Sequence, residues 1–294
     1  MRFDVAPELR LFAESVRAAV GGWQPAREPD LGAWLDDRYG ALGARLAAAG
    51  WQELWSDADL GAVVAGGFEL GRAVAPVCTI DESTLGAPLA VDGRVRHGLG
   101  AGTCAVPEPG WALALARPAA TRRRERTLDG SGTVLAALAD AAPLGSSEAD
   151  ARWAAWTAAT LAYLAGLAAA ALDRTVEHAR SREQFGRPLS AMPAVQARLA
   201  EAALAVDGLL LTAWQAATPD RGSRAPSLLW AGSACRAVTA SAHQVHGATG
   251  FALETGLHRS YRRAKSVQVW TAAVCRAVTS PSRRRRPAAR GGAP

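Results

Sequence analysis

The sequence predicts a mainly α-helical protein with an N-terminal helical domain, a truncated β middle segment and a C-terminal antiparallel four-helix bundle. Long Ala/Leu-rich stretches, which favour helix, fill both ends of the 294-residue chain. Between them lies a segment rich in Pro and Gly with short alternating stretches, a pattern typical of strands. Because 49% of the residues are hydrophobic, the chain can bury a sizeable core. The predicted parts are residues 1–100 (helical), 101–147 (reduced β segment), 148–280 (bundle) and 281–294 (Arg-rich disordered tail).

The N-terminal part is expected to form three or four helical elements. They are Pro7–Val20, Leu31–Ala49, Leu60–Ala73 and a shorter element near Ser83–Val91. Gly50 is expected to end the second helix, because glycine accepts the left-handed conformation that follows many helices. Asp57 is a candidate N-cap for the third. Asp81 and Glu82 are interpreted as part of a solvated loop.

The middle segment predicts strands at Trp111–Ala116 and Thr133–Leu138, with Asp129-Gly130 as a hairpin signal. The four predicted helices of the bundle follow at Glu148–Arg180, Ala194–Ala217, Ser227–His246 and Gly256–Val278, the last interrupted near Val267. Trp153–Leu172 comes closest to a membrane span. Its many small residues indicate instead a helix buried inside the bundle, so no membrane association is expected.

Charge and cysteine content exclude several functions. The net charge is +6, but Arg283–Arg286 and Arg290 lie in the tail, so the body is nearly neutral and nucleic acid is not an expected partner. The four cysteines are scattered singly, without metal-ligand spacing, and no metal is expected. The N-terminus shows no apolar signal region. A cytoplasmic protein with reduced thiols is therefore expected.

The stretch Ser181–Pro188 (SREQFGRP) predicts a tight turn between two long helices, because Gly186 and Pro188 interrupt helix. It places Arg182, Gln184 and Phe185 at a helical corner. A guanidinium binds pyrophosphate and an aromatic ring stacks on a flat base, so the corner suits a planar, phosphate-bearing ligand. A solvent-facing turn with Phe185 as a plug is the alternative interpretation.

A second stretch, Gln244–Glu254 (QVHGATGFALE), is followed by basic residues at Arg262-Arg263-Ala264-Lys265. Together the two stretches resemble the C-terminal domain of the flavin-dependent acyl-CoA dehydrogenases. That family has an Arg-x-x-Phe-Gly turn, then a Gln-x-x-Gly-Gly-x-Gly-Phe turn and an Arg-Asp-Ala-Lys-like segment in this order. Leu42–Trp55 and Gly67–Pro76 resemble its first helical domain, so the resemblance covers roughly residues 8–100 and 149–275.

The resemblance implies FAD as cofactor and assigns its adenine and pyrophosphate side to six residues of the two turns, often across a subunit interface. They are Arg182, Gln184, Phe185, Gln244, Gly247 and Ala248. Ala248 stands where the family has a second glycine, and Arg263 stands where it has an aspartate.

The residues needed for catalysis depart from the family pattern. Acyl-CoA dehydrogenation needs a carboxylate that removes the α-proton. The two positions that supply this glutamate in the family fall on Thr271 and Trp156, and neither is acidic. Val106–Gly110 (VPEPG) resembles a degraded Thr-Glu-Pro-Gly motif, and the middle segment is less than half the family's length. No catalytic residue is therefore assigned.

The resemblance thus implies a subunit of a heteromeric acyl-CoA dehydrogenase that completes the FAD site of a second, acyl-CoA dehydrogenase-like subunit. An α2β2 assembly acting on a bulky, possibly steroid-derived acyl-CoA is implied. Two alternatives stay open. One is a flavin-independent lyase or cyclase using Glu254, His246 or Glu108. The other is a non-enzymatic oligomerisation or binding protein whose interior is filled by Trp111, Trp156 and Trp270.

Overall fold

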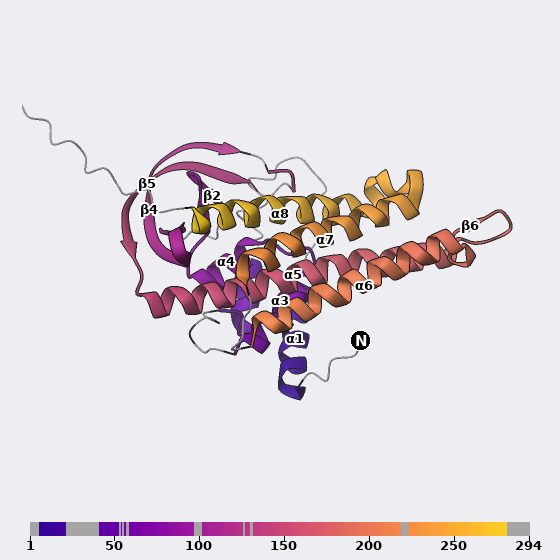
Figure 1. Ribbon diagram of the computed structural model, residues 1–294, viewed down its shortest axis with the longest axis horizontal. Coiled ribbons are helices and arrows are strands. Elements are labelled where there is room, and N and C mark those ends of the chain that lie inside the picture. Colours follow the sequence, from indigo (N-terminus) through magenta and orange to yellow (C-terminus); the bar gives the residue numbers. More distant parts are fainter. Residues whose placement is uncertain are drawn as a thin grey trace, which may run out of the picture.

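The computed structural model describes residues 6–21, 41–52, 54, 56, 59–96, 102–125, 127–129, 132–218 and 223–280. Long helices run side by side through the molecule, and a curved sheet covers one end of them (Figure 1). The predicted mainly α fold with its C-terminal helical bundle is confirmed. The bundle helices are α5 (Ser146–Ser181), α6 (Pro193–Ala216), α7 (Arg224–His246) and α8 (Leu257–Thr279).

Helix α8 is continuous, so the interruption predicted near Val267 is wrong. Val267 itself is 1% exposed and lies in the core. Val267 therefore contributes to packing between helices.

The N-terminal helices are α1 (Pro7–Val20), a helical segment at residues 41–48, α3 (Leu60–Arg72) and α4 (Cys78–Leu85). Gly50 has a φ of 80°, and the N–H of Trp51 donates to the carbonyl of Leu46, as expected for a glycine stop. The cap of α3 is Asp59, whose Oδ1 accepts from the N–H groups of Gly61 and Ala62. Asp57 and residues 31–40 of the predicted second helix lie outside the described residues.

The sheet is antiparallel, with strand order β1-β2-β5-β4-β3. Its strands are β1 (Ala90–Val91), β2 (Arg94–Arg96), β3 (Cys104–Glu108), β4 (Ala112–Glu125) and β5 (Thr133–Pro143). A parallel bridge between Leu89 and Ala105 joins the two outer strands.

The sheet begins at Ala90, before the predicted start of the β segment at residue 101. Two turns explain the difference. Gly86, in the left-handed conformation, ends α4 at Leu85, so no single element spans Ser83–Val91. Asp92 and Gly93 both have positive φ, at 52° and 73°, which is the pattern of a tight hairpin between β1 and β2.

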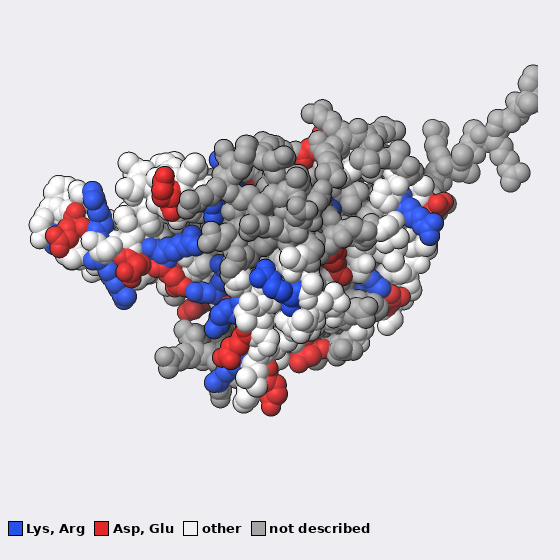
Figure 2. Space-filling model, turned by 180° about the vertical axis from the view of Figure 1, so that it is seen from behind, with Lys and Arg blue, Asp and Glu red and all other residues white. Residues whose placement is uncertain are grey.

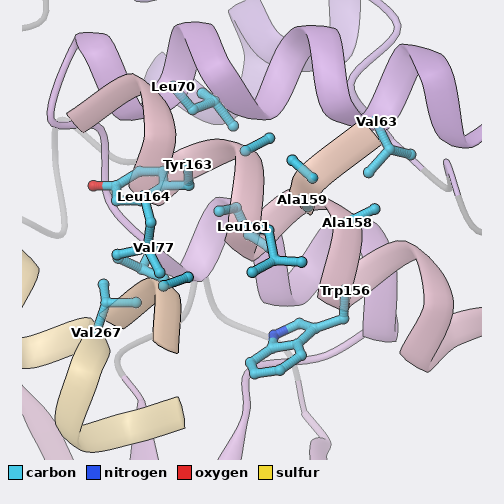
Figure 3. Close-up of a cluster of buried hydrophobic side chains, with 14 of the residues drawn as sticks. Val63, Leu70, Val77, Trp156, Ala158, Ala159, Leu161, Tyr163, Leu164 and Val267 are labelled. Carbon is cyan, nitrogen blue, oxygen red and sulfur yellow. The ribbon is translucent and has the colours of Figure 1, made fainter. Parts of the chain in front are cut away.

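The core is built around α5, against which α3 packs closely (Figure 3). The contact depends on glycines: a Cβ on Gly71 would lie 2.0 Å from the carbonyl oxygen of Tyr163, and one on Gly166 would lie 2.0 Å from that of Phe68. By length and composition α5 alone among the described helices resembles a membrane span, but 89% of its most apolar window is buried inside the protein. Burial on this scale is typical of a core helix.

Candidate functional site

The first predicted turn is a hairpin at the far end of the bundle from the sheet (Figure 1). Arg182 ends α5, and β6 (Glu183–Gln184) pairs with β7 (Arg187–Pro188). Phe185 and Gly186, the two residues between the strands, have φ values of 54° and 74°. A two-residue hairpin turn with both φ values positive suits glycine but strains a phenylalanine.

The predicted ligand-binding side chains of this turn all face outward. Arg182 and Gln184 are exposed, and the ring of Phe185 is 91% exposed. Because the ring of Phe185 is exposed and its backbone is strained, this side chain adds no burial energy to the fold of its own subunit. It is available for contact with another molecule.

The second predicted turn follows α7. Gly247 has a φ of 59° and opens the short helical turn η3 (Gly247–Phe251), which η4 (Leu253–Thr255) follows. Gln244, Gly247 and Ala248 are exposed, and Phe251 is 78% exposed.

Histidines bring the two turns together. The ring of His178, in the last turn of α5, stacks on that of His246, the last residue of α7, with centroids 4.1 Å apart and planes 18° from parallel. His246 Nδ1 lies 2.9 Å from the carbonyl oxygen of Ala242, so this nitrogen carries the proton. All six predicted cofactor residues thus lie at one end of the bundle, called the bundle tip below.

Burial lowers the pKa of both stacked imidazoles. The pKa of His178 is lowered further by the neighbouring His246 and Arg182, whereas the hydrogen bond to the Ala242 carbonyl partly opposes the lowering of the His246 pKa. Lowered pKa values favour the neutral form of both rings at pH 7, which avoids like-charge repulsion within the stack.

The two positions where the family has its catalytic glutamate lie at the other end, in the protein interior. Trp156 is 0% exposed and Thr271 is 1% exposed. The hydroxyl of Thr271 donates to the carbonyl of Val267 in its own helix. Neither position offers a base, in agreement with the sequence.

A chain of contacts runs from Trp156 through Asp81 and Arg96 to Trp270, the neighbour of Thr271, and these residues are called the closed interior below. The indole N–H of Trp156 donates to Asp81 Oδ1 at 2.9 Å, and Arg96 forms an ion pair with the same carboxylate at 3.1 Å. The guanidinium of Arg96 lies 4.7 Å from the ring centroid of Trp270. Asp81 and the side chain of Arg96 are 0% and 5% exposed.

The expectation that Asp81 lies in a solvated loop is wrong. Asp81 lies in α4, which turns inward against the bundle, and its burial raises the pKa of the carboxyl group. Arg96 opposes this shift, which keeps the carboxylate paired. No local pattern marks Asp81 as an interior residue, because its partners come from β2 and α5.

Aromatic contacts extend from the closed interior toward the sheet. Trp111 lies edge-on to Trp153 at 5.4 Å, and Trp153 lies edge-on to Trp156 at 5.3 Å. Of the three tryptophans named in the scaffold alternative, Trp156 is thus fully buried, whereas Trp111 and Trp270 are half-buried.

A second buried ion pair ties the β4–β5 loop to the bundle. Arg263 Nε lies 2.9 Å from Asp129 Oδ2, and Arg263 Nη1 donates to the carbonyl of Ala75 at 2.8 Å. The hydroxyl of Tyr163 donates to the same carbonyl, and burial raises its pKa to about 12. Arg263, which stands where the family has an aspartate, is thus paired with an acidic residue from the β4–β5 loop.

The residues proposed for flavin-independent chemistry do not converge. Glu108 ends a strand of the sheet, whereas His246 and Glu254 lie at the bundle tip, at opposite ends of the molecule (Figure 1). Glu254 is exposed. Among the described residues no cluster of His, Cys, Asp or Glu could hold a metal ion.

The two ends differ in their fit to a dinucleotide. At the bundle tip, a Cβ on Gly186 or Gly247 would meet nothing within 4 Å, so the backbone is open to a ligand beside exposed Arg182 and Phe185. The closed interior is packed with indole rings and ion pairs. The tip fits the phosphate and adenine end of FAD, and the described interior does not fit a flavin ring.

Comparison with known proteins finds relatives of the C-terminal part of the chain. The family model described as acyl-CoA dehydrogenase, C-terminal domain, matches residues 154–271. The bovine mitochondrial short-chain specific acyl-CoA dehydrogenase is 36% identical over 109 residues, which cover 35% of this chain and 26% of the relative. A 3-sulfinopropanoyl-CoA desulfinase from Paraburkholderia xenovorans is 35% identical over 105 residues, covering 33% and 26%. The matched segment therefore spans about a quarter of these relatives' length.

Solved structures resemble the chain over nearly its whole length. The ChsE4-ChsE5 complex from Mycobacterium tuberculosis aligns with a TM-score of 0.70 and 21% identity, covering 93% of this chain and 96% of the other. Butyryl-CoA dehydrogenase from Megasphaera elsdenii aligns with a TM-score of 0.67 and 14% identity, covering 95% and 98%.

The arrangement of helices and sheet is thus the acyl-CoA dehydrogenase fold. Residues 154–271, which carry the family match, form an acyl-CoA dehydrogenase C-terminal domain.

Proposed function

We propose that this chain is a non-catalytic subunit of a heteromeric acyl-CoA dehydrogenase. In this proposal, its bundle tip completes the FAD site of a second, acyl-CoA dehydrogenase-like subunit that carries the catalytic carboxylate. FAD, when bound, supplies the hydride acceptor. The substrate is an acyl-CoA with a bulky, steroid-derived acyl group, the assembly is α2β2, and the location is cytoplasmic.

The closed interior is the observation that carries this proposal. Removing an α-proton requires a base within hydrogen-bond reach of the substrate. At the two family positions the chain offers a buried indole and a threonine hydroxyl, and a threonine hydroxyl is far too weak a base. The carboxylate of Asp81 contacts one of these two positions, Trp156, but it is also held in an ion pair with Arg96.

The bundle tip supports the role of the chain toward its partner. Arg182 would bind the pyrophosphate, Phe185 would stack on the adenine, and Gln184 and Gln244 would donate to the same end of the dinucleotide. Gly247 and Ala248 would lie along it. All six lie on the outside of their own subunit, as a shared site requires.

The structural comparisons motivate the partner and the substrate class. One similar structure is described as a complex, ChsE4-ChsE5, and another as the Tcur3481-Tcur3483 steroid ACAD, with a TM-score of 0.68 and 20% identity. Both descriptions name two components. At these identities the likeness supports the fold, and the partner remains part of the proposal.

Co-expression with an acyl-CoA dehydrogenase homologue from a neighbouring gene tests the function. We expect the chain purified alone to be colourless and the complex to show the visible absorption of bound flavin. The double substitution of Arg182→Ala and Phe185→Ala is expected to lower the flavin content of the complex without preventing its assembly. Leu204→Ala, at an exposed position of α6, is the matched control.

Two outcomes would contradict the proposal. One is a chain that binds flavin and oxidises a thioester alone. The other is a stable complex whose flavin content is unchanged by the tip substitutions. The second outcome would favour the non-enzymatic scaffold, with which the closed interior also agrees.

A further inference from the structure

A hollow of about 380 Å³ lies between α1, α3 and α6, apart from both the bundle tip and the closed interior. Its apolar walls are Leu9 on α1, Val64 and Phe68 on α3, and Leu210 and Trp214 on α6. Ligand sites in proteins commonly have volumes of roughly 300–1,000 Å³ and mostly apolar walls with a few polar groups.

Small residues keep the hollow open. Ala13 of α1 and Ala65 of α3 both line it, where any larger apolar side chain would fill it. Gly61 nearby lets the helices approach, because a Cβ there would lie 3.0 Å from Leu9 Cδ1 and 3.6 Å from a Trp214 ring carbon. Gly61 thus allows α1 and α3 to approach closely beside the hollow.

The charges that line the hollow cancel. They are Arg10, Glu14, Arg17 and Glu69. Arg17 Nε and Nη2 donate to the two carboxylate oxygens of Glu69 at 2.9 and 2.8 Å, and Glu69 is 5% exposed. Arg10 is also engaged in an interaction. A charged ligand would therefore gain no surplus counter-charge here, whereas the apolar walls favour a neutral one.

The volume and the aromatic walls set the size and shape of the ligand. An apolar cavity of about 150 Å³ holds one benzene molecule, so the hollow has room for roughly two fused rings. Phe68 and Trp214 present aromatic rings from two different helices, and aromatic rings contribute stacking energy beyond their buried area.

From these observations we infer that the hollow between α1, α3 and α6 binds an uncharged, flat, apolar molecule the size of two fused rings. This site does not depend on the proposed FAD site, since none of its lining residues belongs to the bundle tip.

Calorimetric titration of the full chain with three molecules of one shape tests the inference. The molecules are 2-naphthylmethanol, 2-naphthoate and 2-naphthylmethylammonium, which are neutral, anionic and cationic. We expect one equivalent of the neutral molecule to bind at least about tenfold more tightly than either ion, a difference of about 1.4 kcal/mol. Ala65→Phe, which fills the hollow, should weaken that binding by at least about tenfold.

Leu11→Phe is the matched control, because it adds a ring on α1 at a residue that is 65% exposed and does not line the hollow. If Ala65→Phe fails to fold by circular dichroism, Leu210→Trp fills the hollow from α6. Absence of saturable binding, equal binding of an ion, or unchanged binding to a folded filled variant would each overturn the inference.

Discussion

Phe185 combines an almost fully exposed ring with a left-handed backbone, at a φ of 54°. Left-handed conformation costs a residue other than Gly, Asn or Asp about 1–2 kcal/mol. Phe185→Asn should therefore stabilise the isolated chain by about 0.5–1 kcal/mol in denaturant unfolding, because asparagine tolerates this conformation. Phe251→Asn is the control, since Phe251 is also exposed but is not among the positive-φ residues. Equal effects of the two changes would show that Phe185 is unstrained.

Asp81 and Arg96 are both buried, so losing one partner leaves the other charge uncompensated. Arg96→Met should lower the free energy of unfolding by about 3–5 kcal/mol at neutral pH. Arg94→Met, which breaks the more exposed pair with Glu125, should cost only about 0–1 kcal/mol.

The loss in Arg96→Met should shrink in acid. Burial raises the folded-state pKa of Asp81 above its unfolded value, so the folded chain binds the proton more strongly. Stability contributed by such a group is present at low pH and is lost as the pH rises through the folded pKa. Unfolding measured between about pH 4 and pH 7 tests this, because Asp has an ordinary pKa of about 3.9. If the loss of unfolding free energy in Arg96→Met does not change with pH, it arises from packing and not from the charge of Asp81.

At the scale of elements, the His178–His246 stack couples the end of α5 to the end of α7. Burial lowers both pKa values in the folded chain, so the unfolded chain binds more protons. Stability should therefore fall as the pH drops below about 6.5, the ordinary pKa of histidine. His178→Phe keeps an aromatic stack without the titrating group and should reduce this pH dependence. Unfolding curves at several pH values provide the measurement, and an unchanged dependence in the variant would contradict it.

The contact between α3 and α5 has no room for a methyl group at its two glycines. Gly71→Ala or Gly166→Ala should lower the free energy of unfolding by about 1–3 kcal/mol or more, because the obstructing atoms belong to the backbone. Gly102→Ala, where a Cβ would meet nothing within 4 Å, should change it by less than about 0.5 kcal/mol. Denaturant titration distinguishes these outcomes. If Gly166→Ala leaves the free energy of unfolding unchanged, α3 and α5 can move apart without destabilising the protein.

For the whole molecule, one hydrophobic cluster connects Val16 of α1, Leu113 of β4 and Val274 of α8. The Asp129–Arg263 pair further joins the sheet to the bundle. Tryptophan fluorescence and circular dichroism should therefore report a single coincident unfolding transition. Two separate transitions would show that the sheet and the bundle fold independently.

Charge on the outer surface is mixed. Over the face in Figure 2, basic and acidic side chains of the described residues are interspersed. Mixed charge of this kind favours specific pairwise contacts over attraction to a long polyanion.

The sequence predicted the helices well, because their apolar stretches and end signals are local. α1 matches its expected bounds and α5 differs by a few residues. The Asp92-Gly93 hairpin was missed although its signal is local. Asp81–Arg96 and Asp129–Arg263 could not be predicted, because each pair forms only when separate elements dock. The six cofactor residues were placed by resemblance, and their role stays a prediction.

The bridge between Leu89 and Ala105 brings the first and last strands of the sheet into contact. Edge strands with unpaired backbone groups can pair with another chain, and contact between the two edges makes such pairing harder. Addition of a strand from another chain is therefore harder at these edges, whereas the helical surfaces present side chains for contact.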